Sequence, residues 1–293
     1  MSDEALNIVL TGGGSGIGAA IARILGKDGH KVIICGRREN KLKKTAKSST
    51  NILYKKCDVS NENNVLDFLN FVKSKFNYVD VLINCAGIFG EVNRFDKTDS
   101  KLWKKTFEIN TFGTYLSTKH FLKLISKSNK KKIINFSGGG AFSPFPNYSA
   151  YAVSKAAVVR FSENLATELK DLGITVNCVA PGFVATALHE ATLKAGKEKA
   201  GKHYDVTIEK LKKGSVPIDT PVNCVKFLIS DESNDLTGKT ISANFDSWNS
   251  DTFKKAIKEL NSSDLYALRR VNLVNLDPDD SLRVKLTKVQ KRG

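Results

Sequence analysis

The chain of 293 residues is short of several residue types, and each shortage excludes a class of protein. It has five cysteines, none in a C-x-x-C pair, and four histidines without metal-ligand spacing. The pattern therefore predicts neither a disulfide framework nor a metal site. We interpret the cysteines as small buried hydrophobes in a reducing compartment. They are Cys35, Cys57, Cys85, Cys178 and Cys224.

Long hydrophobic runs are also missing. No segment approaches the about 18 consecutive apolar residues of a membrane span, so none is predicted. The first five residues lack the basic and apolar regions of a signal peptide, and we expect a cytoplasmic location. Repeats and low-complexity linkers are missing too. The hydrophobic content of 41% argues against disorder and predicts a chain that buries a large core.

What the chain has in excess is positive charge. It holds 46 lysines and arginines against 30 acidic residues, a formal net charge of +16. This balance predicts attraction to an anion, such as a phosphorylated cofactor, an acidic carrier or nucleic acid. The lysines are widely spread, and no zinc-finger or RNP-type signature accompanies them. We therefore expect no nucleic-acid partner, and keep a polyanion-binding protein as an alternative.

Short apolar runs alternate with helical patterns along most of the chain. This alternation predicts an α/β fold, a Rossmann-type doubly wound parallel sheet of about seven strands with helices on both faces. The expected strands are 7–11, 31–35, 52–57, 79–85, 133–136, 174–179 and one within 236–244. The expected helices are 15–27, 39–47, 61–75, a single long one over 100–126, 150–172 and 222–230.

The same pattern predicts the domain organisation. We expect residues 1–248 to form one domain, in which the lysine-rich, weakly helical segment 185–213 interrupts the alternation and is predicted to be a lid. Residues 249–293 form a C-terminal extension outside the alternation. It contains Arg269 and Arg270 and the run Asp277-Pro278-Asp279-Asp280. The extension is either a surface appendage or oligomer arm, or a segment whose arginines reach an anionic substrate or a neighbouring subunit.

A glycine-rich turn follows the first expected strand directly. Gly12, Gly16 and Gly18 have the spacing G-x-x-x-G-x-G, with Ser15 and Ile17 between them. Glycines allow the backbone to approach a pyrophosphate at a helix N-terminus, where free N–H groups favour negative charge. A P-loop would require G-x-x-x-x-G-K-[ST], which the chain lacks. The turn therefore predicts a dinucleotide site.

The end of the second strand indicates which dinucleotide is bound. An acidic residue there would bond the ribose 2′-hydroxyl of NAD. The chain has Arg37 and Arg38 after Gly36 instead, so no carboxylate would repel a 2′-phosphate and an arginine fork could hold it. We predict NADP(H) as the preferred cofactor, with NAD(H) as the alternative.

Tyr151 and Lys155 lie four residues apart in an expected helix, and so share one face. A phenol ordinarily loses its proton near pH 10 and is a poor base at neutral pH. A nearby ammonium favours the phenolate, and we expect Lys155 to lower the pKa of Tyr151. A tyrosine tuned in this way would act as a general acid and base.

With these features in order, the chain resembles the classical short-chain dehydrogenase/reductase family from residue 7 to about 246. Asn84-Cys85-Ala86-Gly87 resembles the family's N-N-A-G, with Cys85 replacing the second asparagine. Further matches are Asp58-Val59, Asn110, Pro181-Gly182 and Thr186. The resemblance implies that Asp58 and Val59 contact adenine, that Asn84, Ala86 and Gly87 lie beside the adenosine, and that Pro181, Gly182 and Thr186 contact the nicotinamide.

The family usually carries its catalytic serine thirteen residues before the tyrosine, where this chain has Gly138. Ser137 precedes it, in a run Ser137-Gly138-Gly139-Gly140-Ala141 that resembles one branch of the family. The resemblance suggests that Ser137 is the catalytic serine, with Ser143 and Ser149 as weaker candidates. Asn110 would hold a water of the proton relay, and Lys155 would bond the nicotinamide ribose.

The resemblance implies an NADP(H)-dependent oxidoreductase of the EC 1.1.1 class, which interconverts a carbonyl and a secondary alcohol. Its catalytic residues would be Tyr151, Lys155, Ser137 and Asn110, without a metal. The partners expected are a small-molecule substrate and further copies of the chain, in a homodimer or homotetramer. The alternative is a catalytically inactive dinucleotide sensor on the same fold. Residues 89–95, 141–147 and the lid should set specificity, but their sequence does not reveal the substrate.

Overall fold

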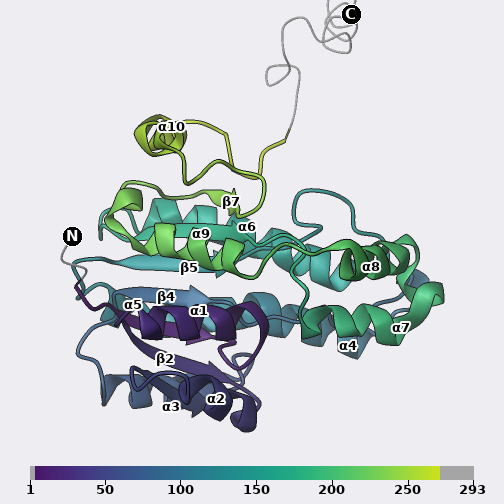
Figure 1. Cartoon of the computed structure of the whole chain (residues 1–293), viewed down its shortest axis with the longest axis horizontal. Coiled ribbons are helices and arrows are strands. Elements are labelled where there is room, and N and C mark those ends of the chain that lie inside the picture. Colours follow the sequence, from purple (N-terminus) through teal and green to yellow (C-terminus); the bar gives the residue numbers. More distant parts are fainter. Residues whose placement is uncertain (1–3, 271–293) are drawn as a thin grey trace, which may run out of the picture.

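The structure, a computed structural model, describes residues 4–270. Its centre is a sheet of seven parallel strands in the order β3-β2-β1-β4-β5-β6-β7 (Figure 1). The order runs outward in both directions from β1 and β4, which is the doubly wound arrangement. The strands are β1 Asn7–Thr11, β2 Lys31–Gly36, β3 Ile52–Lys56, β4 Val81–Asn84, β5 Lys132–Phe136, β6 Thr175–Ala180 and β7 Thr240–Ser242. The predicted fold class is confirmed.

The helices cover both faces of this sheet because successive strand side chains point to opposite faces. In β1, Ile8 and Leu10 join one apolar core with α1 and α9, whereas Val9 joins the other with α3, α5 and α6. The helices are α1 Gly16–Lys27, α2 Glu39–Ala46, α3 Glu62–Lys73, α4 Ser100–Phe107, α5 Gly113–Ile125, α6 Ser149–Glu168, α7 Glu190–Ala200, α8 Lys202–Lys213, α9 Asp219–Ile229, α10 Asp251–Lys255 and α11 Ile257–Ser262.

The long helix predicted over residues 100–126 is interrupted. Between α4 and α5 the chain forms a π-helical turn, Glu108–Phe112, before α-helical geometry resumes. A π turn inserts an extra residue into the helical ladder and is frequent at functional sites. Here the insertion carries Asn110, which is fully buried.

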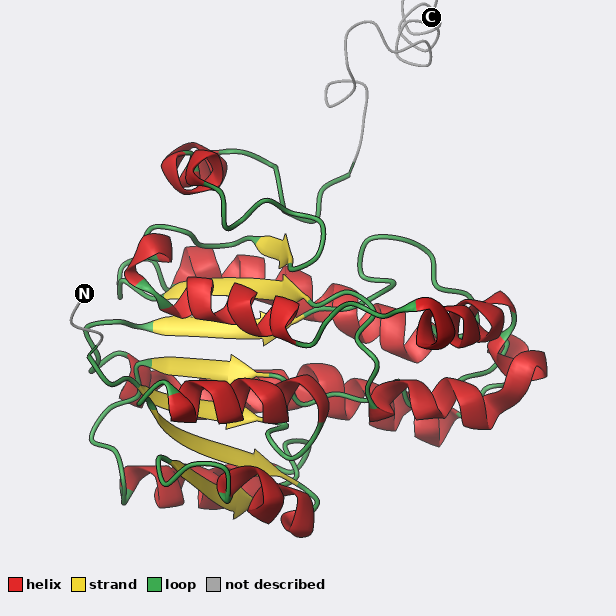
Figure 2. Ribbon diagram, in the orientation of Figure 1, coloured by secondary structure: helices red, strands yellow, loops and turns green. Residues whose placement is uncertain are grey.

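The lysine-rich segment predicted as a lid forms α7 and α8. Both helices lie beyond the carboxyl ends of the strands, toward which the arrowheads point in Figure 2. Gly196, at φ 74°, kinks α7, and Gly201 separates α7 from α8. Ligands of doubly wound sheets bind at this edge, so the segment stands where a lid is required.

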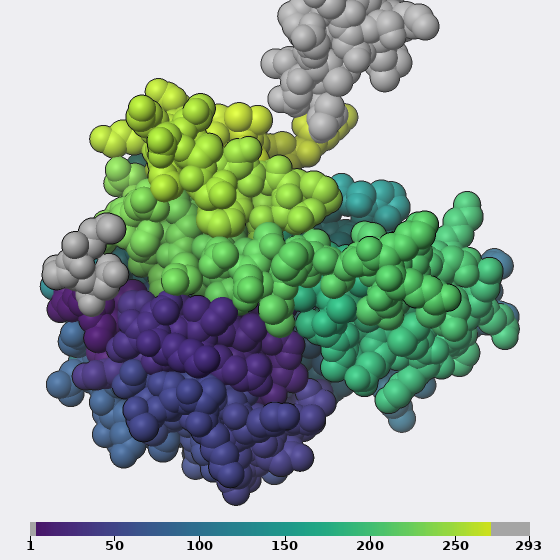
Figure 3. All heavy atoms as spheres, viewed as in Figure 1, coloured from purple at the N-terminus to yellow at the C-terminus, as the bar shows by residue number. Residues whose placement is uncertain are grey.

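After β7 the chain folds back onto the body of the molecule. Phe253 of α10 and Ile257 and Leu260 of α11 are buried in the same core as α9. In Figure 3 the described segment after β7, in yellow and yellow-green, lies on the green part of the chain that includes α9. The described part of the C-terminal extension is therefore packed against the fold. The run Asp277–Asp280 lies outside the described residues.

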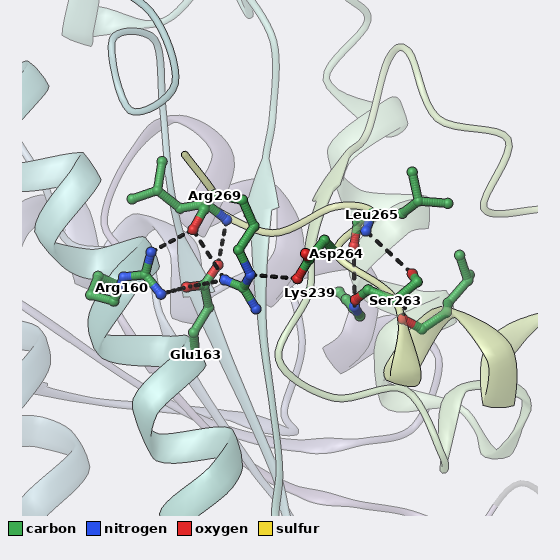
Figure 4. Close-up of polar contacts among 9 residues, drawn as sticks. Arg160, Glu163, Lys239, Ser263, Asp264, Leu265 and Arg269 are labelled. Carbon is green, nitrogen blue, oxygen red and sulfur yellow. Dashed lines mark hydrogen bonds and ion pairs between the residues drawn. The ribbon is translucent and has the colours of Figure 1, made fainter. Parts of the chain in front are cut away.

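The last described residues of this extension are bonded to α6 (Figure 4) and to β7. Glu163 accepts a hydrogen bond from the Leu268 backbone N–H at 2.6 Å and pairs with Arg160 and Arg269. The Tyr266 carbonyl accepts a bond from the N–H of Thr240, on the free edge of β7, at 2.7 Å. Arg269 is thus held by Glu163 and by Asp264, which differs from its predicted reach toward a substrate or a neighbouring subunit.

Within residues 4–270 the structure has no helix that combines the length and the apolar character needed to cross a membrane.

Candidate active site

A cavity of about 540 Å³ opens at the carboxyl edge of the sheet, over β1 and β4. Its floor is the glycine turn, one end is formed by the residues after β2 and β3, and the other by Tyr151, Lys155 and Ser137. Residues that follow six different strands, β1 to β6, therefore meet in one space. Residues between Thr186 and Ala191, at the start of the segment predicted to be a lid, also line the cavity.

The glycine turn is shaped by contacts that leave no space for side chains. Gly12 has a φ of 77°, and a Cβ atom there would lie 2.8 Å from the Ala86 backbone. A Cβ atom at Gly18 would lie 2.5 Å from the Gly12 carbonyl oxygen. The turn therefore brings bare backbone to the N-terminus of α1, where N–H groups favour an anion. This exposed backbone fits the pyrophosphate of a dinucleotide.

The end of the cavity beside β2 is basic. Arg37 and Arg38 both line it, and the Arg38 Nη2 donates to the Ser15 hydroxyl at 2.9 Å. Asp58 lines the cavity from the end of β3. Burial alone would raise the pKa of this carboxyl, but hydrogen bonds from Ser60 and the nearby cations lower it overall. Asp58 is therefore an ionised hydrogen-bond acceptor at neutral pH.

Tyr151 stands at the opposite end of the cavity, in the first turn of α6. It is 5% exposed, and its ring meets that of Phe89 edge-on, with centroids 4.6 Å apart. Its hydroxyl lies against Gly138, where a Cβ atom would be only 2.1 Å from the phenolic oxygen. The hydroxyl therefore occupies space that only a glycine at position 138 leaves free.

The electrostatics of Tyr151 differ from the prediction of a lowered pKa. Burial raises the pKa of its phenol above the ordinary value, because the phenolate loses its hydration. The Lys155 Nζ donates to the Phe136 carbonyl at 2.8 Å, and burial lowers the pKa of Lys155 to about 8. The prediction took account of the ammonium but not of the burial that both groups share. At neutral pH the phenol holds its proton.

Asn110 lies directly behind this pair, held by the π turn. Its side-chain amide donates to the Ile88 carbonyl and to the Ser154 hydroxyl, each at 2.9 Å, and accepts from the Ile88 N–H. The Asn110 Oδ1 and the Lys155 Nζ both face Gly87, at 3.3 and 3.4 Å from the place of a Cβ atom. Asn110 therefore ties α6 to the loop after β4, and does not line the cavity.

Ser137 borders the cavity at the end of β5. It is 3% exposed, and its Oγ has no hydrogen-bond partner within the described part of the chain. A buried hydroxyl without a partner is costly, and such groups are often completed by a ligand. The other candidate serines, Ser143 and Ser149, are not on the cavity wall.

With this geometry in view, comparison with known proteins decides the family. A model of the short chain dehydrogenase family matches residues 6–196. This chain is a short-chain dehydrogenase. It is 32% identical over 241 residues to short chain aldehyde dehydrogenase 1 of Euphorbia lathyris, which covers 78% of this chain and 83% of that protein. It is 31% identical over 238 residues to a 3-oxoacyl-(acyl-carrier-protein) reductase of Rickettsia felis, over 80% and 94% of the two chains.

Solved structures of the family share the fold. The crystal structure of a variant actinorhodin polyketide ketoreductase with NADPH has a TM-score of 0.74 and 27% identity, over 81% of this chain and 95% of that one. The structure of levodione reductase has a TM-score of 0.75 and 25% identity, over 83% and 97%. The predicted family is confirmed, and with it an oxidoreductase of the short-chain type.

The cavity of this dehydrogenase contains most of the residues expected to hold a cofactor. They are Gly12, Ser15, Gly16, Ile17, Gly18, Arg37, Arg38, Asp58, Val59, Ala86, Gly87, Tyr151, Lys155, Pro181 and Thr186. Asn84 and Gly182 are not on the wall. The buried Asn84 amide donates to Thr118 and Asn135, so it joins β4 to β5 and α5. The cofactor-binding assignments remain predictions.

Sequence reasoning missed part of the wall. Cys57, Cys85 and Ile88 were not predicted, whereas Phe89, Leu188, Glu190 and Ala191 lie in segments expected to set specificity but were not singled out. Phe89 follows the Asn84–Gly87 motif by two residues and lies in the segment expected to set specificity. The residues of the segment 185–213 gave a weaker signal, because the sequence of a lysine-rich helix does not fix which of its apolar positions face the cavity. The helical spacing of Leu188, Ala191 and Ala195 was the available sign.

Proposed function

We propose that this short-chain dehydrogenase is an NADP(H)-dependent oxidoreductase that interconverts a carbonyl and a secondary alcohol. The observation that carries the proposal is the position of Tyr151. Its protonated, buried hydroxyl borders the same cavity as the glycine turn, at the end remote from Arg37 and Arg38. A nicotinamide cofactor bound in this cavity would supply or receive the hydride.

Each catalytic residue has a separate role in the proposal. Tyr151 donates its proton to the substrate oxygen during reduction, and a raised pKa suits this direction because the phenol stays protonated. Ser137 directs its free hydroxyl at the same oxygen and stabilises the charge that develops there. Lys155 holds the cofactor ribose and returns a proton to Tyr151, and Asn110 positions the water that supplies it.

The cofactor preference follows from the basic end of the cavity. Arg37, and Arg38 held by Ser15, would bond the 2′-phosphate of NADP(H), and no carboxylate stands immediately after β2 to repel it. The related ketoreductase was solved with NADPH, and the Rickettsia felis relative is also a reductase. NAD(H) remains the alternative cofactor.

The proposal extends to the organisation of the protein. Residues 1–248 are the catalytic domain, residues 185–213 are the lid over the substrate, and residues 249–293 are a C-terminal extension. We place the protein in the cytoplasm as a homodimer or homotetramer. Exposed apolar side chains on α4, the π turn and α5, namely Leu102, Phe112 and Tyr115, offer a surface for a second copy.

The replacement Tyr151→Phe tests the mechanism. It removes the proton donor and keeps the ring, so we expect the kcat for ketone reduction to fall by about 10²- to 10⁴-fold with NADPH binding retained. Steady-state kinetics and NADPH fluorescence titration measure the two effects. Tyr148→Phe is the matched control, because its hydroxyl bonds Thr192 on α7 and not the cavity.

The outcomes separate the proposal from its alternatives. A Tyr151→Phe enzyme within about tenfold of the wild type contradicts the general-acid role. Tight NADPH binding with no turnover of any carbonyl compound supports a catalytically inactive sensor. Binding to polyanions that weakens steeply with salt, and survives replacement of Gly16, supports the polyanion-binding alternative.

A further inference from the structure

The part of the cavity beyond Tyr151 has an apolar wall. Phe89 meets the Tyr151 ring at 4.6 Å, and Leu188 and Ala191 of the lid side pack against the same cluster. All three residues also line the cavity. Leu188 and Ala191 are three residues apart and so present one face toward the tyrosine. Whatever molecule presents its reacting carbon to Tyr151 must lie against this wall.

Apart from Lys155, no lysine or arginine of residues 4–270 lines the cavity at this wall, and Lys210 lies behind it, 5.2 Å from the centroid of the Phe183 ring. Besides Asp58, the charged residues that line the cavity in the described chain are Arg37, Arg38, Lys155 and Glu190. The two arginines lie at the far end, after β2, and Lys155 is committed to the Phe136 carbonyl. Glu190, next to Ala191, would repel an anion. The lysines of α7 and α8 are not among the described residues on the cavity wall.

The two histidines behind the wall do not supply positive charge either. His189 stacks on Phe183 and meets Phe89 edge-on, while His203 packs against Phe145 and Tyr148. Burial lowers the pKa of both rings, to about 4 for His189, so both are neutral at neutral pH. An anionic group on the substrate would therefore lose its hydration here and gain no partner.

Two residues with hydroxyl groups, Tyr151 and Ser137, line this end of the cavity. The Tyr151 hydroxyl and the unpartnered Ser137 hydroxyl belong to residues that are 5% and 3% exposed. Two donors can satisfy the two lone pairs of a single carbonyl oxygen. These two hydroxyls can thus bond one oxygen atom of a substrate, while the apolar side chains of the wall contact the rest of it.

We infer that the substrate is an uncharged ketone whose only polar group near the wall is the reacting carbonyl, set in an apolar alicyclic or aliphatic frame. The inference rests on the proposed function. It names Phe89, Leu188 and Ala191 as the residues that determine specificity by contact with this frame.

A matched pair of ketones tests the inference. 4-Methylcyclohexanone and 4-oxocyclohexanecarboxylate share a ring and differ in charge. With NADPH and the full-length wild-type enzyme at pH 7, we expect kcat/KM for the methyl compound to exceed that for the carboxylate by at least about 100-fold, because the carboxylate would be buried without a partner. Equal turnover, or preference for the carboxylate, overturns the inference and leaves the reductase proposal standing.

A charge placed on the wall provides the second measurement. Leu188→Lys puts an ammonium beside the frame of the substrate, and the ratio of the two kcat/KM values should fall at least about tenfold. Leu193→Lys is the control, since Leu193 lies on α7 at 38% exposure and away from the cavity wall, and should leave the ratio unchanged. An unchanged ratio in Leu188→Lys argues against contact with this wall. No turnover of either ketone or of a wider carbonyl panel, with NADPH bound, overturns the proposed function itself.

Discussion

At the scale of single residues, Gly138 sets the environment of Tyr151, the proposed proton donor. The Tyr151 hydroxyl lies where the first side-chain atom of any other residue at position 138 would stand. The neighbouring Ser137 keeps its hydroxyl in the same cavity. The site therefore offers a serine and a tyrosine hydroxyl without a side chain between them.

The replacement Gly138→Ala should displace the phenol. A methyl group 2.1 Å from the hydroxyl forces the ring or the loop to move. Since misplacement by about 1 Å can cost 10²-fold, we expect kcat to fall by about 10- to 100-fold, with NADPH affinity kept. Gly139→Ala is the control, because its Cβ atom would meet Phe145 at an ordinary 3.8 Å. Equal kcat values for both variants would show that the contact has no catalytic consequence.

The sequence predicted which residues form the site better than it predicted their pKa values and hydrogen bonds. The glycine spacing and the Tyr151–Lys155 pair pointed to the correct cavity, because backbone space and helical spacing are local properties. The pKa of Tyr151 was predicted in the wrong direction, because burial comes from distant residues such as Phe89 and Leu188. The bonds of Asn84 to Thr118 and Asn135 likewise depend on tertiary packing.

At the scale of elements, the lid is joined to the site by packed aromatic rings. His189 stands between Phe183, at a centroid distance of 3.9 Å, and Phe89, which touches Tyr151. The lid was predicted only as a weakly helical segment. The π turn was not predicted at all, since the apolar pattern over residues 100–126 is compatible with one uninterrupted helix.

The burial of His189 makes the free energy of unfolding depend on pH. Its folded pKa of about 4 is below the ordinary 6.5, so between these pH values only the unfolded chain binds a proton. The stabilisation is complete above pH 6.5 and is lost as the pH falls toward 4. As the pH falls toward 4, we expect the titration of His189 to lower the free energy of unfolding by about 2 kcal/mol. This figure is smaller than the full pKa shift implies, because solvent screens part of the effect.

Urea unfolding at pH 7 and pH 4.5 measures this contribution. His189→Phe keeps an aromatic ring beside Phe183 and cannot titrate, so its drop between the two pH values should be smaller than that of the wild type. Phe183→Leu weakens the stacking and keeps the histidine, and should lower stability about equally at both pH values. His203 and Lys210, the other titratable groups that act on His189, stay in place in each variant. The same drop in His189→Phe would refute the assignment.

At the scale of the whole molecule, the C-terminal extension returns to the helix that carries the active site. Tyr151 and Lys155 lie in the first half of α6, and Arg160 and Glu163, which hold residues 268–269, lie in the second. The alternation of strands and helices predicted the sheet and the catalytic domain because it is a periodic pattern. The docking of the extension was not predictable, because both the burial of Phe253, Ile257 and Leu260 beside α9 and the bond of Glu163 to the Leu268 backbone join residues far apart in the sequence.

Glu163→Gln should weaken this attachment. The Glu163 side chain is 9% exposed and faces Arg160 and Arg269, which are 48% and 42% exposed. Loss of its charge should cost about 2 kcal/mol of stability, less than for a fully buried pair because the arginines retain water. Hydrogen exchange of the amides of residues 264–268 should become faster. Glu168→Gln, on the exposed end of α6, is the control. Unchanged exchange in Glu163→Gln would contradict the role given to Glu163.

This attachment also imposes an order on biosynthesis. Arg160 and Leu268 bond across 108 positions of the chain. At a translation rate of about 5–20 residues per second, the helix of the proton donor leaves the ribosome about 5 to 20 seconds before the segment that secures it. The nascent chain thus passes through a stage in which the glycine turn and α6 have been synthesised, but the residues that bond Arg160 and Glu163 of α6 have not.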